Sequence, residues 1–428
     1  MLAATTVVLL ILIALALPIA VVLGILALFL DVVYTPMPLQ NAMGEVLWTH
    51  SNNVILVAIP LFILMGELML RSGIADKMYG AMVQWLAWLP GGLMHANIGT
   101  CALFAATSGS STATAATIGV TALPQVYKRG YNERLFLGSL AAGGTLGILI
   151  PPSINMIFYG FLTDTSVPQL FLAGVIPGLM LSALYMLVIF TCCVLRRDWD
   201  GDPEHTSWEL RFRTLIDLLP PILIFIVVVG SIYAGWATPT EAAALGVFSA
   251  MALAAANRRL SWPTMGDSIL GTIRTSAMII LITVIALYLN FVLAAVGLVQ
   301  EVNQFILGLG WTPLQTMLFI IGIYIVMGMV MDTLAMVVLT VPVITPVVVS
   351  LGYDPVWFGI LIVILSETAV LTPPVGMLCY VIQGIRNRGS LNDVFIGIAP
   401  FMLALAAMIG LMLAFPQIAL WLPTYFYR

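Results

Sequence analysis

The chain has 428 residues, of which 61% are hydrophobic and 8% are charged, and its net charge is −4. A soluble domain cannot bury this much apolar surface, so the composition predicts an all-α polytopic protein in a lipid bilayer. The small net charge gives no indication of a nucleic-acid partner. Four cysteines without C-x-x-C spacing are expected to be buried small residues, not a disulfide framework or a metal site.

Uninterrupted apolar runs indicate the first set of membrane helices. The N-terminal run has no Lys or Arg before it and reaches Leu30, which is too long for a signal-peptide core, so we expect a retained span. Thr238, Pro239 and Glu241 match a capping box with proline at the first helical position, which predicts a helix start near 240. The expected spans are 4–30, 50–70, 168–195, 214–233, 240–256, 268–296 and 391–416.

Two further apolar runs, 134–162 and 356–385, are each interrupted by a proline pair. Proline has no amide hydrogen and clashes with the preceding turn, so Pro151-Pro152 and Pro373-Pro374 are expected to break these helices within the membrane. The carbonyl groups that are freed then need protein, water or an ion as a partner. As candidate ligands for one Na⁺ at each break, we expect the carbonyls of Leu149, Ile150, Leu371 and Thr372.

Two segments, 93–127 and 313–350, are long enough to enter and leave the membrane but are interrupted near their middles. In the first, 15 of the 17 residues from 105 to 121 are Ala, Gly, Ser or Thr. This composition suits a close-packed hairpin better than a lipid-facing span. We expect both segments to form re-entrant hairpins, preceded by helical arms at 71–90 and 297–312.

The hairpins and the broken helices are related by an internal repeat. A shift of 222 residues brings the first proline pair onto the second, and the tip Gly109-Ser110-Ser111 onto Met331-Asp332-Thr333. A duplicated hydrophobic chain with a broken helix in each half is typical of a secondary transporter. The repeat therefore predicts a transport site where the tips meet the breaks.

The distribution of basic residues predicts the orientation of the chain. With a cytoplasmic N-terminus and nine full spans, 14 of the 15 Lys and Arg fall in cytoplasmic segments, the exception being Arg428. Lys128 and Arg129 lie beside the first hairpin, whereas residues 351–354 beside the second contain no basic residue. The hairpins are therefore expected to open to opposite sides, as in the inverted repeats that form alternating-access sites.

The hairpin tips carry the residues best suited to bind a ligand. Hydroxyls and exposed carbonyls of the first tip are hard ligands for a small cation, and the helix N-terminus that follows would attract an anion. Close packing of small residues is the alternative explanation. At the second tip, Asp332 either helps to bind a cation or only caps the helix that begins near Thr333. Glu367 is expected to bind a proton or cation, or to hydrogen-bond across to the hairpin.

Other mechanisms have less support. The sequence has no G-x-x-x-x-G-K-[ST] motif for ATP and no H-E-x-x-H motif for zinc, and its three histidines, His50, His95 and His205, are isolated. We expect a protein that is not an enzyme and name no catalytic residue. An intramembrane enzyme or assembly factor is a remote alternative. For an enzyme of this kind, Ser110 and Asp332 are the only candidate nucleophile–base pair.

Three motifs in this order, 109–115 (GSSTATA), 147–152 (GILIPP) and 237–243 (ATPTEAA), resemble the large membrane subunit of tripartite ATP-independent periplasmic (TRAP) transporters. The resemblance covers nearly the whole chain. It implies a Na⁺-coupled importer of the bacterial inner membrane, with an elevator-type fold similar to that of the ion-transporter superfamily. A stand-alone Na⁺/divalent-anion symporter, which needs no binding protein, is the alternative.

The same resemblance implies the partners of the chain. They are a small membrane subunit of about four helices, a periplasmic substrate-binding protein and an organic acid such as a C4-dicarboxylate or sialic acid. It also implies a transport domain at 71–162 and 297–390, each part with an arm, a hairpin and a broken helix. The implied scaffold takes 1–70, 163–296 with a cytoplasmic loop at 196–213, and 391–428.

Site residues follow from the resemblance by position. One Na⁺ site is implied at each tip with its facing break, and the substrate is implied between the tips. The implied Na⁺ ligands are Ser108, Gly109, Ser110, Ser111, Leu149 and Pro151, and Met331, Asp332, Thr333, Thr368, Thr372 and Pro373. The implied substrate-binding residues are Ser110, Ser111, Thr112, Asn155, Asp332, Thr333 and Pro374.

Overall fold

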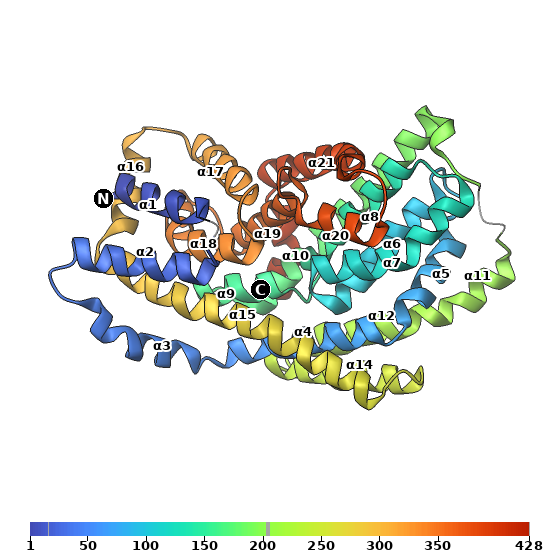
Figure 1. Ribbon diagram of the computed structural model, residues 1–428, viewed down its shortest axis with the longest axis horizontal. Helices are drawn as coiled ribbons and strands as arrows, with labels where there is room; N and C mark the ends of the chain where they lie inside the picture. Colours follow the sequence, from blue (N-terminus) through green and yellow to red (C-terminus); the bar gives the residue numbers. More distant parts are fainter. Residues whose placement is uncertain (16, 203–205, 428) are drawn as a thin grey trace.

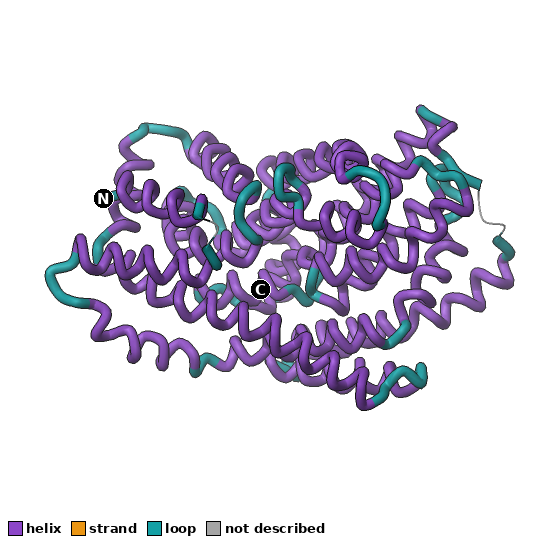
Figure 2. Tube along the Cα trace, viewed as in Figure 1, coloured by secondary structure: helices purple, strands orange, loops and turns teal. Residues whose placement is uncertain are grey.

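Helices account for every regular element in the part of the chain that the computed structural model describes, residues 1–15, 17–202 and 206–427 (Figure 1, Figure 2). The expected all-α class is therefore confirmed. Arg428 and His205, which were considered above, lie outside the described residues.

By length and composition, seven helices of the described chain are able to cross a membrane, or eight if one bent pair counts as a single span. This set differs from the nine spans expected. The N-terminal run does not give one long helix, and Pro355–Leu371 is shorter than a full span. By contrast, Thr333–Ser350, expected as one arm of a hairpin, is long and apolar enough to span.

The N-terminal run forms two helices, so the single span expected at 4–30 is wrong. α1 (Leu2–Ala14) ends before Pro18, and α2 (Ile19–Tyr34) starts directly after it. Proline removes a helical hydrogen bond and disfavours the helical conformation in the residue before it, so the helix stops although the apolar run continues. Two short elements that were not expected follow, η1 (Leu39–Ala42) and α3 (Met43–Ser51).

Four helices pack along one long side of the molecule (Figure 1): α2, α4 (Val54–Arg71), α14 (Pro239–Ala256) and α15 (Trp262–Ala295). The predicted capping box is present at the start of α14, where Thr238 N donates to Glu241 Oε2 over 2.8 Å. Glu67 and Arg71 form an ion pair at the end of α4, as their spacing predicts. The capping box thus locates the start of α14 correctly.

Four helix pairs with nearly the expected bounds occupy the positions where hairpins and broken helices were expected. Each hairpin turns at its small or polar tip, and each broken helix stops at its proline pair. Both Pro-Pro peptide bonds are cis, and the first broken helix bends by 40°. The hairpins are α6 (Gly92–Ser108) with α7 (Ser111–Arg129) and α17 (Pro313–Gly328) with α18 (Thr333–Ser350), and the broken helices are α8 (Glu133–Leu149) with α9 (Ile154–Thr163) and α19 (Pro355–Leu371) with α20 (Met377–Arg386).

The remaining helices connect these pairs or cover them. The arms are helical as expected, the span expected from 214 begins earlier, and a C-terminal helix that was not expected packs on α10. These elements are α5 (Ile74–Leu86), α10 (Val167–Leu195), η2 (Arg197–Trp199), α11 (Trp208–Thr214), η3 (Leu215–Leu218), α12 (Leu219–Phe225), η4 (Ile226–Gly230), α13 (Ser231–Tyr233), α16 (Leu298–Gly308), α21 (Leu391–Ala414) and α22 (Gln417–Phe426).

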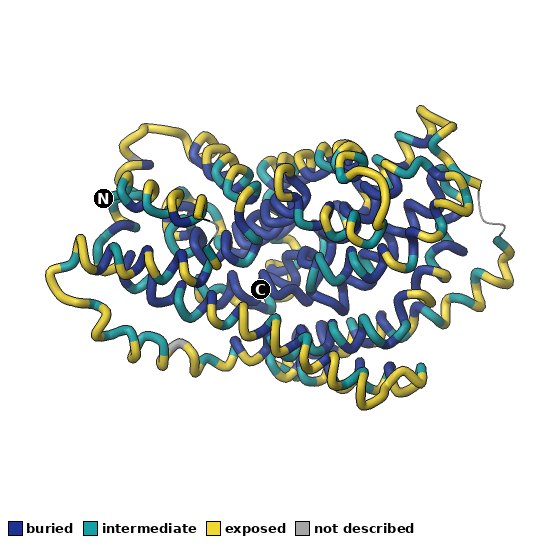
Figure 3. The backbone as a smooth tube through the Cα atoms, viewed as in Figure 1, coloured by how far each residue is buried: buried dark blue, intermediate teal, exposed yellow. Residues whose placement is uncertain are grey.

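α19 lies in the centre of the molecule, where the tube is almost entirely dark blue (Figure 3). Every residue from 356 to 371 is buried. The helix is apolar on all sides apart from a short polar stretch, Ser366-Glu367-Thr368, near its broken end. The central position of α19 therefore places a buried acid beside the other elements that meet there.

α8 and α21 cross at two glycines with no side chain between them. A Cβ atom added at Gly138 would lie 2.0 Å from the carbonyl oxygen of Gly397, and one added at Gly397 would lie 1.9 Å from the carbonyl oxygen of Arg134. Both distances are far below van der Waals contact, so only glycine permits this helix separation. Helix α21 is thus joined closely to the first broken helix.

Candidate functional site

Hydroxyl groups hold the first hairpin tip in its turn. Gly109 takes a left-handed conformation with φ of 61° at the end of α6. Ser110 then caps α7 by accepting a hydrogen bond from Ala113 N over 3.4 Å. The hydroxyls of Ser108 on α6 and Thr114 on α7 lie 2.8 Å apart and connect the two helices of the hairpin. The tip that was expected to carry ligands is therefore a closely bonded turn, not an extended loop.

The first tip packs against the first broken helix with almost no space between the two backbones. A Cβ atom at Gly147 would lie 2.5 Å from the Ser110 carbonyl oxygen, and one at Gly109 would lie 3.0 Å from the Pro152 carbonyl oxygen. The glycines thus bring carbonyl and hydroxyl oxygens of the tip and the break into one small region. Such hard oxygen atoms are the ligands that small cations take.

Asp332 caps the helix after the second tip. Its Oδ2 accepts a hydrogen bond from Leu334 N over 3.2 Å, at the start of α18. The capping role considered above is therefore observed. A role for Asp332 in binding a cation stays a prediction.

A cavity of about 220 Å³ brings the two tips and the two breaks together. Its walls come from both hairpins, both broken helices and α15. Seven of the residues expected from the sequence line it: Gly109, Ser110, Ser111, Thr112, Asn155, Asp332 and Thr333. The other lining residues are Ile148, Ile154, Thr275, Met278, Ile279, Leu334, Val370 and Met377.

The wall formed by α15 was missed at the sequence level. Thr275, Met278 and Ile279 contribute it from the middle of a long apolar helix. That helix carries other Ser and Thr residues at similar intervals, so Thr275 had no feature to distinguish it. A helix from outside the repeat pattern therefore completes the site.

All four half-helices that follow a tip or a break begin at this cavity. Their first residues, Ser111 of α7, Ile154 of α9, Thr333 of α18 and Met377 of α20, are lining residues. A helix N-terminus presents unpaired N–H groups and about half a positive elementary charge. No lining residue is Lys, Arg or His, and Asp332 is the one acid among them. Helix ends, not basic side chains, thus supply the positive potential in this part of the chain.

Asn155 adds a hydrogen-bond donor to the wall. Its side chain is 3% exposed, and its Nδ2 atom has no hydrogen-bond partner among the described residues. Buried amide donors in folded proteins normally have a partner. The Asn155 donor is therefore an unpaired polar group in the wall of the cavity, among the described residues.

Eight of the residues that the resemblance implies as Na⁺ or substrate ligands do not line this cavity. The hydroxyls of Thr368 and Thr372 donate to carbonyls of their own helix, those of Ile364 (2.9 Å) and Thr368 (2.6 Å). The Leu371 carbonyl, expected to have lost its partner, has the Cys379 thiol 3.8 Å away as a weak donor. The eight residues are Ser108, Leu149, Pro151, Met331, Thr368, Thr372, Pro373 and Pro374. Their assignment to Na⁺ or substrate stays a prediction.

Glu367 forms a hydrogen bond between the two halves of the chain. Its side chain is fully buried, and Ser111 Oγ donates to its Oε1 over 2.6 Å. The second oxygen, Oε2, has no hydrogen-bond partner in the described part of the structure. The hydrogen bond to the hairpin, one of the two alternatives above, is thus observed. A role in binding a proton or cation stays a prediction.

Ser110 and Asp332 do not form a nucleophile–base pair, although both line the cavity. Ser110 Oγ lies 3.2 Å from Thr112 Oγ1 and accepts from Ala113 N, while Asp332 accepts from Leu334 N. A hydrolytic mechanism would need the serine hydroxyl to be hydrogen-bonded to its base. The geometry gives the alternative of an intramembrane enzyme no support.

Known proteins are similar to this chain in sequence and in fold. Residues 6–418 match the family model described as the DctM component of the tripartite ATP-independent periplasmic transporter. The chain is 32% identical over 423 residues to the C4-dicarboxylate TRAP transporter large permease protein DctM of Rhodobacter capsulatus, and the match covers 95% of each protein. It is 30% identical over 376 residues to the sialic acid TRAP transporter large permease protein SiaM of Vibrio cholerae, covering 88% of this chain and 87% of SiaM.

One relative is longer than this chain. The isethionate TRAP transporter permease protein DctMQ of Oleidesulfovibrio alaskensis is 32% identical over 390 residues, which are 90% of this chain but 61% of DctMQ. Among solved structures, the YdaH transporter of Alcanivorax borkumensis has a TM-score of 0.66 at 14% identity, covering 97% of this chain and 99% of that one, and so shares its fold. From the family match and these relatives we conclude that the chain belongs to the DctM family, the large permease component of TRAP transporters.

Proposed function

We propose that this permease imports a small organic acid across the bacterial inner membrane, driven by Na⁺. The observation that carries the proposal is the meeting of four helix N-termini at one cavity without a basic side chain. Unpaired N–H groups of this kind bind carboxylates and similar anions. The Ser and Thr hydroxyls and the free Asn155 amide supply further hydrogen-bond donors for such a substrate.

The choice of substrate class is consistent with the relatives, whose names include C4-dicarboxylate, isethionate and sialic acid permeases. We propose that the substrate lies between the tips, against Ser110, Ser111, Thr112, Asn155, Asp332 and Thr333. Ser111 opens the half-helix that would face the carboxylate, whereas the N-terminus at Thr333 is already capped by Asp332. Pro374, also expected at this site, does not line the cavity and is given no substrate contact in the proposal.

Na⁺ is the coupling ion in this proposal. At the first tip, the Ser110 carbonyl packs against Gly147 and the Pro152 carbonyl packs against Gly109. Carbonyl oxygens of this kind are the ligands that a small cation takes. At the second tip, the carboxylate of Asp332 is the corresponding ligand. The remaining expected positions at each break, Leu149 and Pro151 and then Thr368, Thr372 and Pro373, are retained as candidate carbonyl or hydroxyl ligands.

We further propose an elevator motion of an inverted repeat, with the N-terminus in the cytoplasm. The hairpins and broken helices would slide as one body against the side formed by α2, α4, α14 and α15. The division expected from the sequence placed α21 in the fixed part. The glycine crossing of α8 and α21 favours a different division, because two helices whose backbones touch have no room to slide past each other.

The partners are proposed to be a small four-helix membrane subunit and a periplasmic substrate-binding protein. Proteoliposomes that contain this chain and its small subunit would test the whole proposal. Uptake of labelled organic acids is measured with and without an inward Na⁺ gradient, and with and without the periplasmic substrate-binding protein. Uptake that needs both supports the proposal, uptake that needs Na⁺ alone favours a stand-alone symporter, and uptake that is independent of Na⁺ contradicts the coupling.

Two aspartate variants sharpen this test. Asp332 and Asp354 both cap helices, and Asp354 does so away from the cavity, where its Oδ1 accepts from Val356 N over 2.7 Å. Asparagine preserves a cap almost fully while it removes the charge. Asp332→Asn is expected to weaken the apparent Na⁺ affinity, and Asp354→Asn is expected to leave it unchanged. The same Na⁺ dependence in both variants would refute a cation site at the second tip.

A further inference from the structure

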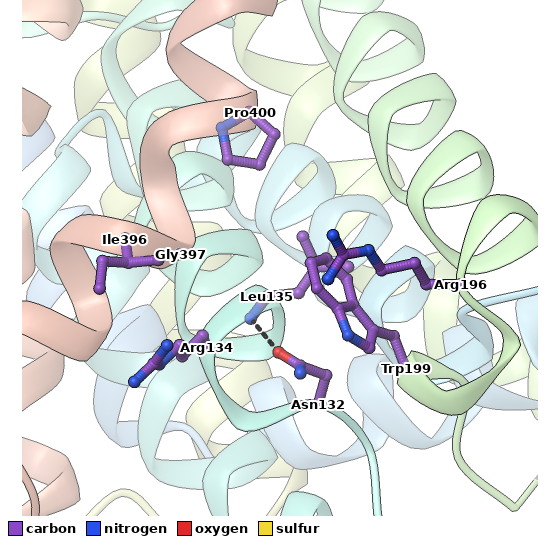
Figure 4. Close-up of a pocket in the computed structure, with 8 residues that line it drawn as sticks. All are labelled: Asn132, Arg134, Leu135, Arg196, Trp199, Ile396, Gly397 and Pro400. Carbon is purple, nitrogen blue, oxygen red and sulfur yellow. Dashed lines mark hydrogen bonds between the residues drawn. The ribbon is translucent and has the colours of Figure 1, made fainter.

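A second cavity, of about 410 Å³, lies where the start of α8, the end of α10 and the start of α21 meet (Figure 4). It shares no lining residue with the substrate cavity. Polar and basic side chains form part of its wall, and apolar residues of α8 and α21 form the rest. The lining residues are Asn132, Arg134, Leu135, Arg196, Trp199, Ile396, Gly397 and Pro400.

Arg196 is the cation of this cavity that has no acidic partner. Its guanidinium lies over the ring of Trp199, 4.7 Å from the ring centre, and no ion pair joins it to an acid of the described residues. Arg134, by contrast, is paired with Asp393 at 3.0 Å and extends away from Trp199 (Figure 4). Asp200, close to Arg196 in the chain, accepts a hydrogen bond from Gly91 N instead. One positive charge is therefore left for a ligand.

The helices on either side of the cavity expose large apolar side chains. On α10, Leu187 is 57% and Leu195 is 78% exposed, and on α21 the exposed residues are Ile396 and Leu403. In a membrane helix, such faces contact acyl chains. Trp199 beside them is the residue type that is enriched at the membrane–water boundary. The cavity therefore has a polar end with Arg196, and exposed apolar side chains lie in its wall at Ile396 and next to Arg196 in the chain at Leu195.

Basic residues near this end of the molecule are typical of a cytoplasmic connection, and Asp198, Asp200 and Asp202 lie in the same connection. Arg197 follows Arg196 directly, and Lys128 and Arg129 end α7 nearby in the chain, before Asn132. An excess of basic residues marks cytoplasmic connections. Anionic phospholipids collect at the cytoplasmic surface and are attracted by basic groups there.

We propose that this cavity binds the headgroup of an anionic glycerophospholipid. The phosphodiester lies at Arg196, the headgroup hydroxyls lie within reach of Asn132, and the acyl chains run along the exposed faces of α10 and α21. A free phosphate would satisfy Arg196 but would leave the exposed apolar side chains uncovered. Those side chains therefore select a lipid over a soluble anion. The bound lipid would link α8, α10 and α21 independently of the transported substrate.

Native mass spectrometry of the purified, delipidated chain tests this site. Phosphatidylglycerol or phosphatidylcholine is added back, and the bound fraction is measured for the wild type and for Arg196→Gln. Loss of one arginine at a membrane surface is expected to weaken phosphatidylglycerol binding about fivefold. Arg211→Gln is the matched control, because Arg211 also lies over a tryptophan, Trp208, at 4.8 Å but outside the cavity. It is expected to bind like the wild type.

Three results would overturn the proposal. Equal phosphatidylglycerol binding by Arg196→Gln and Arg211→Gln would remove the headgroup site. Equal wild-type affinity for phosphatidylglycerol and phosphatidylcholine would show that charge is not recognised, and this comparison needs no variant to fold. Full competition by soluble glycerol phosphate at the same concentration as the lipid would assign the cavity to a free anion.

Discussion

Alanine at Gly138 is expected to destabilise the protein through a backbone clash. The added Cβ atom would lie 2.0 Å from the Gly397 carbonyl oxygen, whereas ordinary contact begins near 3.4 Å, so α8 and α21 would need to separate by roughly 1.4 Å. Neither atom can turn away, because the Gly397 oxygen belongs to the backbone of a helix. Overpacking of this kind costs about 1–3 kcal/mol of unfolding free energy.

Thermal unfolding in detergent measures this effect, and Gly410→Ala is the matched control. Gly410 lies on the same helix, α21, and a Cβ atom there would have nothing within 4 Å. In a helix, Gly→Ala without a clash stabilises by about 0.5–1 kcal/mol. Gly138→Ala is therefore expected to lower the unfolding temperature, and Gly410→Ala is expected to hold or raise it. Equal effects of the two variants would refute the close glycine crossing.

Three further predictions concern the buried acid, the orientation and a charge cluster. Glu367→Gln keeps an acceptor for the Ser111 hydroxyl and should unfold at the same temperature as the wild type. Glu367→Leu removes the acceptor and should lower the free energy of unfolding by about 1–3 kcal/mol; equal stability of the two variants would count against the hydrogen bond. Single cysteines replacing Arg129 and Tyr353 should react with a membrane-impermeant reagent from opposite sides; labelling from one side would end the inverted topology. Arg386→Gln should destabilise the folded protein more than Arg388→Gln. The Arg386 side chain is 4% exposed and paired with Glu133 and Asp393, whereas the Arg388 side chain is 54% exposed. The reverse order would show that these ion pairs do not stabilise the fold.

Most helix boundaries could be predicted from the sequence because they depend on local chemistry. The proline pairs, the capping box at Thr238 and the change from apolar to polar residues each act within a few positions of a helix end. The prediction of a single N-terminal span was wrong because it relied on hydropathy and not on a local signal. Hydropathy averages over a long window and hid the effect of Pro18, a single residue in an apolar run.

The candidate site was predicted only where the repeat pointed to it. The two tips were found because their positions correspond in the two halves of the chain. Thr275 on α15 belongs to neither tip nor break, and its place at the cavity depends on how the helices pack. The hydrogen-bond partner of Glu367 could not be predicted from neighbouring residues either. Ser111 is 256 residues away in the sequence, and the bond forms only in the folded chain.

The bond between Ser111 and Glu367 also bears on how the chain is built. Synthesis proceeds from the N-terminus, so the hydroxyl of the first half is made long before the acid of the second. An acid that enters a membrane without a partner is costly. We therefore expect Ser111 of the first hairpin to be in place as the hydrogen-bond donor that Glu367 of α19 meets when the second half of the chain inserts.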